Sequence, residues 1–244
     1  MEQKGVLVVA HGSRKEEWVA EIDRAVSVLR GLPVEVGFLE KVPGRDMASA
    51  LFRLKEQGVS QVEVIPLFVS SASTHLVEVR YALGLEESCP EESDWPVINH
   101  GLTLHWHPPL DDHPLVVELI LDRIAPLSRD PSQESVLLVA HGSSDPQLKE
   151  KWQVMLGRLA QAVSQRGNFR QVEVATIIPA TIRSKTKELA EQGEVIVIPL
   201  FISPGFYTQT YIPRQFKGLN VRYSGETYLP HPCISHWLVQ EVNR

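Results

Sequence analysis

One nine-residue segment occurs twice in this chain, and it restricts the possible folds more than any other feature. Residues 6–14 read VLVVAHGSR and residues 136–144 read VLLVAHGSS. In each copy a run of apolar residues leads directly into a histidine. A run that is apolar throughout is typical of a strand buried on both faces of a parallel sheet. The histidine then follows the carboxyl end of the strand, where open α/β sheets bind their ligands.

Other segments repeat at corresponding places in the two halves of the chain. The sequence IPLF occurs at residues 65–68 and 198–201, and LKEQG at residues 54–58 corresponds to LAEQG at residues 189–193. These pairs indicate a tandem duplication. We expect one α/β domain over residues 1–127 and a second over residues 135–244, joined by a proline-containing polar linker.

Strand patterns alternate with amphipathic helix patterns along both halves. We expect strands at residues 6–10, 34–39, 62–69, 97–104, 136–140, 172–178 and 195–202, with helices between them. Such alternation favours parallel sheets with right-handed crossovers. The predicted fold class is therefore α/β, with two tandem flavodoxin-like units, each a four-stranded parallel sheet flanked by helices.

Composition narrows the classes of partner. The net charge of −6 argues against a nucleic-acid-binding face, and no apolar run is long enough for a membrane helix. The chain has two cysteines, Cys89 and Cys233, which lie far apart in the sequence, and no recognisable signal peptide. Both features are typical of a cytoplasmic protein. Because the chain carries both halves of the duplication, we expect a monomer.

Several potential metal ligands follow the predicted strands of the first half. His11, Glu40 and His75 follow the first three strands, and the fourth is followed by His105 and His107. The carboxyl ends of parallel strands share one edge, so these side chains are expected to converge. Imidazoles with a carboxylate suit Co²⁺, Fe²⁺, Ni²⁺ or Zn²⁺, and two or three protein ligands would leave coordination positions open.

The second half keeps only part of this set. His141 corresponds to His11, whereas Ile178 aligns with Glu40 and Thr208 aligns with His75. Aromatic residues near this edge, including Tyr207, could line a site for a flat ligand. Basic residues near both predicted edges could hold a polycarboxylate; they are Arg14, Lys41, Arg45, Arg80, Arg183, Lys185, Lys187 and Arg214.

Three segments of the first half together resemble the CbiX/SirB family of class II sirohydrochlorin chelatases, in its two-domain form. They are LVVAHGSR at residues 7–14, FLE at residues 38–40, and VIPLF at residues 64–68 with a histidine shortly after. The resemblance implies a lyase that inserts Co²⁺ or Fe²⁺, with Ni²⁺ also possible, into sirohydrochlorin in cobalamin or siroheme biosynthesis. It implies release of two protons and no ATP or organic cofactor.

The resemblance also implies roles for individual residues. His11 and His75 would bind the incoming metal, and Glu40 would accept pyrrole protons. The predicted tetrapyrrole contacts are Arg14, Arg45, Tyr207 and Thr208. The physiological metal, the pathway, and any contribution of His105, His107 or His141 stay open.

Two other functions fit parts of the pattern. A non-catalytic tetrapyrrole or metal carrier of the same fold is the main alternative, because the second half has lost two of three candidate site residues. A serine hydrolase is disfavoured, because the Gly-Ser after the first strand lacks the preceding glycine of a nucleophile elbow.

Overall fold

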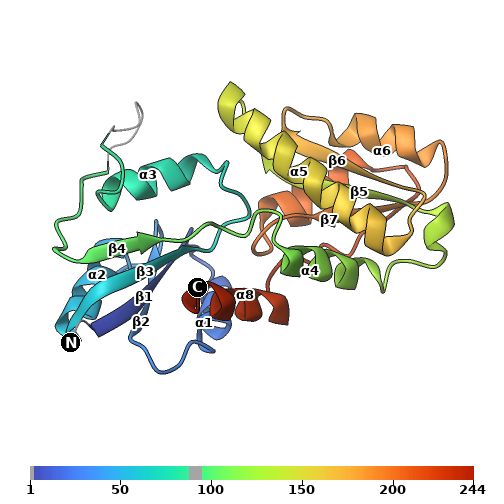
Figure 1. Cartoon of the computed structure of the whole chain (residues 1–244). Helices are drawn as coiled ribbons and strands as arrows, with labels where there is room; N and C mark the ends of the chain where they lie inside the picture. Colours follow the sequence, from blue (N-terminus) through green and yellow to red (C-terminus); the bar gives the residue numbers. More distant parts are fainter. Residues whose placement is uncertain (1–2, 88–94) are drawn as a thin grey trace. The chain divides into compact units, whose positions relative to one another are not determined.

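The computed structural model describes residues 3–87 and 95–244 (Figure 1). They form two compact units, one built from residues up to Leu110 together with Ser235–Arg244, and the other from Asp111–Ile234. Cys89 lies outside the described residues, and Cys233 is buried with a free thiol. No helix in the described part of the chain is both long and apolar enough to cross a bilayer.

The first unit is a four-stranded parallel sheet with the strand order β2-β1-β3-β4. Its elements up to Leu110 are β1 (Gln3–Ala10), α1 (Glu16–Val26), β2 (Val34–Phe38), α2 (Met47–Glu56), β3 (Val59–Pro66), α3 (Thr74–Ala82) and β4 (Thr103–Trp106). This order is that of a doubly wound sheet, in which β1 and β3 are central and end at the same edge.

The central strand β1 is buried on both faces, as its uninterrupted apolar sequence predicts. Its alternate residues Leu7 and Val9 belong to a core cluster that includes buried side chains of α2 and α3. Val6 and Val8 face the opposite side of the sheet, because side chains alternate along a strand, and both are fully buried. The sheet is therefore covered on both faces.

The second unit repeats this topology with the strand order β6-β5-β7-β8, again all parallel. Its elements are α4 (Pro114–Ile124), η1 (Pro131–Gln133), β5 (Ser135–Gly142), α5 (Pro146–Gly167), β6 (Gln171–Ile178), α6 (Ile182–Ala190), β7 (Val195–Pro199), η2 (Tyr207–Tyr211), α7 (Ile212–Gln215) and β8 (Val221–Arg222). The predicted fold class, two four-stranded parallel sheets flanked by helices, is confirmed.

The expected domains at residues 1–127 and 135–244 follow the two repeats of the sequence, and the compact units group the terminal helices differently. Helix α4, which ends the first repeat, packs in the second unit, whereas α8 (Pro232–Val242), which ends the second repeat, contributes Ser235–Val242 to the first. In the first unit, the Ser235 hydroxyl donates to the Ala25 carbonyl of α1 at 3.1 Å. The order of elements cannot reveal this exchange, because a terminal helix after a long connection can pack on either sheet.

Two local expectations also differ from the structure. The fourth strand runs from Thr103 to Trp106 instead of residues 97–104, so His105 lies within the strand. A π-helical turn, η2, follows β7 where the first unit has the regular helix α3. No sequence pattern had indicated either the π turn or the short strand β8.

Candidate metal-binding site

The backbone at the end of β1 brings the predicted site residues His11 and Glu40 side by side. The Glu40 amide donates to the His11 carbonyl at 3.2 Å, and the preceding Leu39 amide donates to Ala10 at 3.0 Å. Gly12, with φ of +96°, permits this approach, since an added Cβ would overlap the Glu40 carbonyl oxygen. The glycine after the histidine is therefore required by the geometry of the sheet edge.

The side chains of His11 and His75 meet at this edge. Their ring centroids are 4.5 Å apart and the rings are nearly perpendicular, with an angle of 85°. The ring of Phe68, which follows β3, lies 5.0 Å from the His11 ring. Two imidazoles from different strand ends thus form a pair with an apolar ring beside one of them.

A short polar turn delivers His75 to the site. The Ser70 side chain is buried, its hydroxyl accepts from the Ala72 amide at 3.1 Å, and its carbonyl accepts from Ser73 at 3.1 Å. Helix α3 then begins at Thr74, so His75 lies in its first turn. The turn sets the start of the helix and hence the position of the second imidazole.

A carboxylate that the sequence reasoning missed contacts His75. Nδ1 of His75 lies 3.0 Å from Oε2 of Glu78, three residues along α3. The side chain of His75 is 46% exposed and that of Glu78 is 23% exposed. The separation of three residues within a helix could have indicated this contact, since such residues share one face.

The Glu40 carboxylate is not part of a closed metal cluster. It forms an ion pair with the Lys41 ammonium group, and its side chain is 51% exposed. Over residues 3–87 and 95–244, no three His, Cys, Asp or Glu side chains are grouped so that they could hold a metal ion. The arrangement therefore consists of two imidazoles, with a solvent-accessible carboxylate on the neighbouring chain segment.

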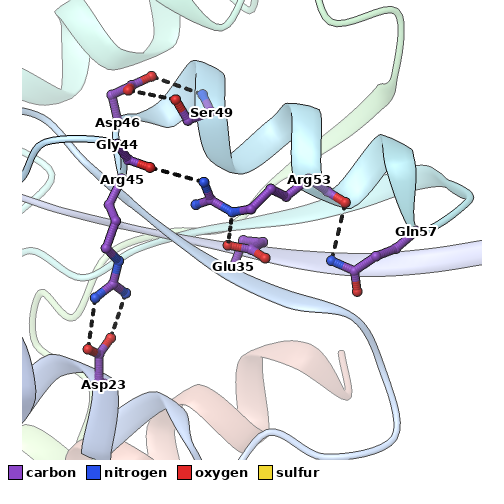
Figure 2. Close-up of polar contacts among 8 residues, drawn as sticks. All are labelled: Asp23, Glu35, Gly44, Arg45, Asp46, Ser49, Arg53 and Gln57. Carbon is purple, nitrogen blue, oxygen red and sulfur yellow. Dashed lines mark hydrogen bonds and ion pairs between the residues drawn. The ribbon is translucent and has the colours of Figure 1, made fainter.

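The loop between Phe38 and α2, which carries Glu40, is held by hydrogen bonds at its α2 end (Figure 2). At its base the Phe38 amide donates to the Arg45 carbonyl at 2.8 Å, and the following Asp46 caps α2 by accepting from the Ser49 amide at 2.9 Å. Arg53 of α2 donates to the Gly44 carbonyl at 3.0 Å. These bonds limit the movement of the segment between Phe38 and α2.

Arg14 and Arg45, the arginines predicted to contact the tetrapyrrole, have different environments. Arg45 forms a two-pronged ion pair with Asp23 of α1, with N–O distances of 2.8 and 2.7 Å (Figure 2). Its guanidinium also lies over the Phe38 ring. Its hydrogen bond to Asp23 raises the pKa of the guanidinium above its ordinary value. Arg14 is exposed between β1 and α1. The Arg45 guanidinium thus already has a partner within the protein.

The two histidines near β4 do not join His11 and His75. His105 is exposed within β4. His107 is held between two carboxylates of its own unit, with Nε2 2.8 Å from Glu63 and Nδ1 3.3 Å from Glu241. The contact with Glu63 is largely shielded from solvent, because the His107 side chain is 12% exposed. Both nitrogens of His107 therefore face protein carboxylates.

The second unit has the same backbone arrangement at the carboxyl edge of its sheet, but a different pair of aromatic side chains meets there. Gly142 has φ of +75°, and an added Cβ would overlap the Ile178 carbonyl oxygen, which matches the relation between Gly12 and Glu40. The His141 ring faces Tyr207, with centroids 5.5 Å apart and an angle of 85°. A tyrosine thus takes the position that a histidine occupies in the first unit.

Thr208 aligns with His75 in the sequence, but the side chain that faces His141 is that of the preceding residue, Tyr207. Thr208 is buried, and its hydroxyl bonds only to the Gly205 backbone among the contacts in the described residues, at 3.0 and 3.2 Å. The connection from the IPLF segment to the following helix is one residue shorter in this unit, where the helix begins at Phe206. Counting along the sequence therefore selects Thr208 instead of Tyr207. Tyr207 also contacts Phe206, whose side chain is exposed.

The pair of imidazoles is suited to transient binding of a divalent metal. Neutral imidazole nitrogens bind borderline ions such as Co²⁺, Fe²⁺ and Zn²⁺, and two protein ligands leave most coordination positions to other groups. A structural zinc site would have four protein ligands. The site can therefore accept a metal and pass it to another ligand.

Comparisons with known proteins agree with the fold. A family model described as CbiX matches residues 5–127 and 135–242. A curated relative, sirohydrochlorin cobaltochelatase from Methanocaldococcus jannaschii, is 38% identical over 85 residues, which is 33% of this chain. The chain spans 57% of the length of that relative.

Solved structures of similar fold cover nearly the whole chain. SirB from Bacillus subtilis with Fe³⁺ superposes with a TM-score of 0.78 at 18% identity, covering 99% of this chain and 94% of that one. SirB from Bacillus subtilis subspecies spizizenii in complex with cobalt gives a TM-score of 0.71 at 19% identity, with the same coverage. The resemblance inferred from the sequence motifs is confirmed by the family match.

Proposed function

Because the chain belongs to the CbiX family, we propose that it is a sirohydrochlorin chelatase that inserts Co²⁺ or Fe²⁺ without ATP or an organic cofactor. The observation that carries this proposal is the imidazole pair of His11 and His75, whose centroids are 4.5 Å apart at the carboxyl edge of the first sheet. The name of the curated relative, a sirohydrochlorin cobaltochelatase, supports the substrate class.

In the proposed reaction, His11 and His75 bind the incoming metal and release it to the macrocycle. Imidazoles are uncharged ligands, so four pyrrole nitrogens, two of them anionic after deprotonation, compete effectively for the ion. The metal is a substrate in this scheme. An open coordination sphere on the protein side allows both sets of ligands to contact the ion during transfer.

We assign Glu40 the role of general base, which accepts the two departing pyrrole protons one at a time and passes each to solvent. Its carboxylate is 51% exposed and so accessible to a ligand, and its amide is hydrogen-bonded to the His11 carbonyl. The Lys41 ammonium group lies beside this carboxylate.

The carboxylates of the macrocycle require basic partners, and its flat face suits aromatic rings. We propose that exposed Arg14 binds substrate carboxylates and that Tyr207 contacts the macrocycle. The same role for Arg45 requires that its guanidinium be shared with Asp23. Thr208 would contribute through its backbone, because its side chain is buried.

The decisive test is an anaerobic assay of the purified protein with sirohydrochlorin and Co²⁺ or Fe²⁺. The proposal predicts insertion well above the spontaneous rate, followed by the change in the absorption spectrum. Stoichiometric binding of sirohydrochlorin with no acceleration would instead support the carrier function. Growth rescue of siroheme-deficient and cobalamin-deficient strains would separate the pathways, since cobalt and iron share ligand preferences.

We also propose that the protein acts as a monomer, because one chain supplies both repeats. Gel filtration should give a mass near 27.4 kDa. An elution mass twice as large would contradict this.

A further inference from the structure

We infer that Glu78 is a positioning residue that fixes the tautomer and orientation of His75 for metal binding. The inference deepens the proposed function and rests on it for its consequence in catalysis. Its basis is the 3.0 Å contact between Nδ1 of His75 and Oε2 of Glu78, together with the contact between the His75 and His11 rings.

The chemistry of the contact decides which nitrogen carries the proton. An ionised carboxylate is only an acceptor, so Nδ1 of His75 must be the N–H donor. In the neutral ring the lone pair then lies on Nε2. A metal ion binds through that lone pair, so Glu78 selects Nε2 as the ligand atom.

The exposure of the His75 ring makes this hydrogen bond important. With 46% of the side chain exposed, packing by itself does not hold the ring, and rotation about χ2 would exchange the positions of its edges. Glu78 is less exposed, at 23%, and lies on the same helical segment, so it provides a fixed anchor. Carboxylate–histidine pairs of this kind orient metal-ligating imidazoles.

The second unit lacks this arrangement. His141 directs Nδ1 at the backbone carbonyl of Gly142, 3.1 Å away, and the ring that faces it belongs to Tyr207. A phenol needs no carboxylate to select a tautomer. A carboxylate that contacts a site histidine, Glu78, is therefore found in the unit where two imidazoles meet.

The first test is the tautomer itself, measured on metal-free full-length protein labelled with ¹⁵N-histidine. Long-range ¹H–¹⁵N correlation spectra are expected to show the Nδ1–H form of His75 in the wild type and a mixture of both forms in Glu78→Ala. A wild-type ring with the proton on Nε2 would overturn the inference.

The second test is Co²⁺ binding, followed by the visible absorption of the ion. Glu78→Ala should weaken binding about tenfold, the lower end of the effect of such outer-shell partners. Glu86→Ala is the matched control, because Glu86 accepts from Arg80 of the same helix at 2.8 Å but does not contact a histidine. Its Co²⁺ affinity should equal that of the wild type.

A double-mutant cycle separates positioning from general support of α3. In the His75→Ala background, Glu78→Ala should have no further effect on Co²⁺ binding. An equal loss in both backgrounds, or unchanged binding in the single variant, would overturn the inference. The tautomer spectra and the Co²⁺ binding measurements use no tetrapyrrole. If both give the expected results but the protein inserts no metal, the proposed function is disproved and the role of Glu78 stands.

Discussion

At the scale of single residues, the site depends on a glycine as much as on its histidines. Gly12 combines a positive φ with a backbone approach that leaves no room for a side chain beside the Glu40 carbonyl. The same combination recurs at Gly142. The repeated His-Gly of the two segments therefore combines a close approach of two chain segments with a histidine at the edge of the sheet.

Replacing Gly12 by alanine should destabilise the first unit strongly. Gly31→Ala is the control, because Gly31 has a similar φ of +87° but no atom within 4 Å of the added Cβ. The control should lose about 1 kcal/mol from backbone strain, and Gly12→Ala at least about 2 kcal/mol more from the clash. Urea unfolding measures both; equal losses would show that the loop yields without cost.

His107 is predicted to stabilise the unit without binding metal. His107→Ala leaves the carboxylates of Glu63 and fully buried Glu241 without their shared partner, which should cost about 1–3 kcal/mol in the free energy of unfolding. Co²⁺ affinity should stay within about twofold, the scatter of distant sites. A tenfold weaker affinity in this variant would mean that His107 is a metal ligand after all.

At the scale of elements, the predicted linker proves to be a structured connection. Glu134, which is 2% exposed, accepts hydrogen bonds from Ser128, from the backbone of Arg129 and Asp130, and from Arg222 of β8. Burial alone would raise the pKa of Glu134, but these donors outweigh it and lower the pKa from 4.5 to about 2. One carboxylate thus ties the connection to the second sheet.

This shift predicts how stability depends on pH. The lowered pKa adds stability that is complete above about pH 4.5 and is lost as the pH falls towards 2, worth roughly 3 kcal/mol. Urea unfolding should therefore find Glu134→Gln less stable than the wild type at pH 7, with the difference shrinking between pH 4.5 and 2. A difference that is independent of pH would contradict this assignment.

The strands and helices were predictable where the pattern is local, and the exceptions have physical reasons. The apolar run of β1 and the Asp46 cap of α2 predicted both elements, and the strand ends predicted that His11 and His75 meet. His75, the partner of His11, lies at the start of α3. The short polar segment before that helix allowed its start to be predicted from the sequence. The connection before the helical turn at Tyr207 is one residue shorter than the corresponding connection before α3, so alignment by sequence selected Thr208 instead of Tyr207.

At the scale of the whole molecule, duplication has produced two sheets of one topology with different carboxyl edges. The sequence repeats match the CbiX model over residues 5–127 and 135–242, yet each compact unit takes its final helix from the other repeat. Sequence similarity records the order of elements, whereas packing decides which sheet a terminal helix covers. The repeats share a fold and differ in the rings that they bring together.

We propose that the first copy of the repeated segment handles metal and that the second does not. The rate of Co²⁺ insertion into sirohydrochlorin tests it most directly, with His11→Ala and His141→Ala as a pair that differs only in the copy changed. We predict a loss of at least about a hundredfold for His11→Ala, because half of the imidazole pair is removed, and a change of less than about threefold for His141→Ala. Equal losses in the two variants, or the larger loss in His141→Ala, would contradict the account.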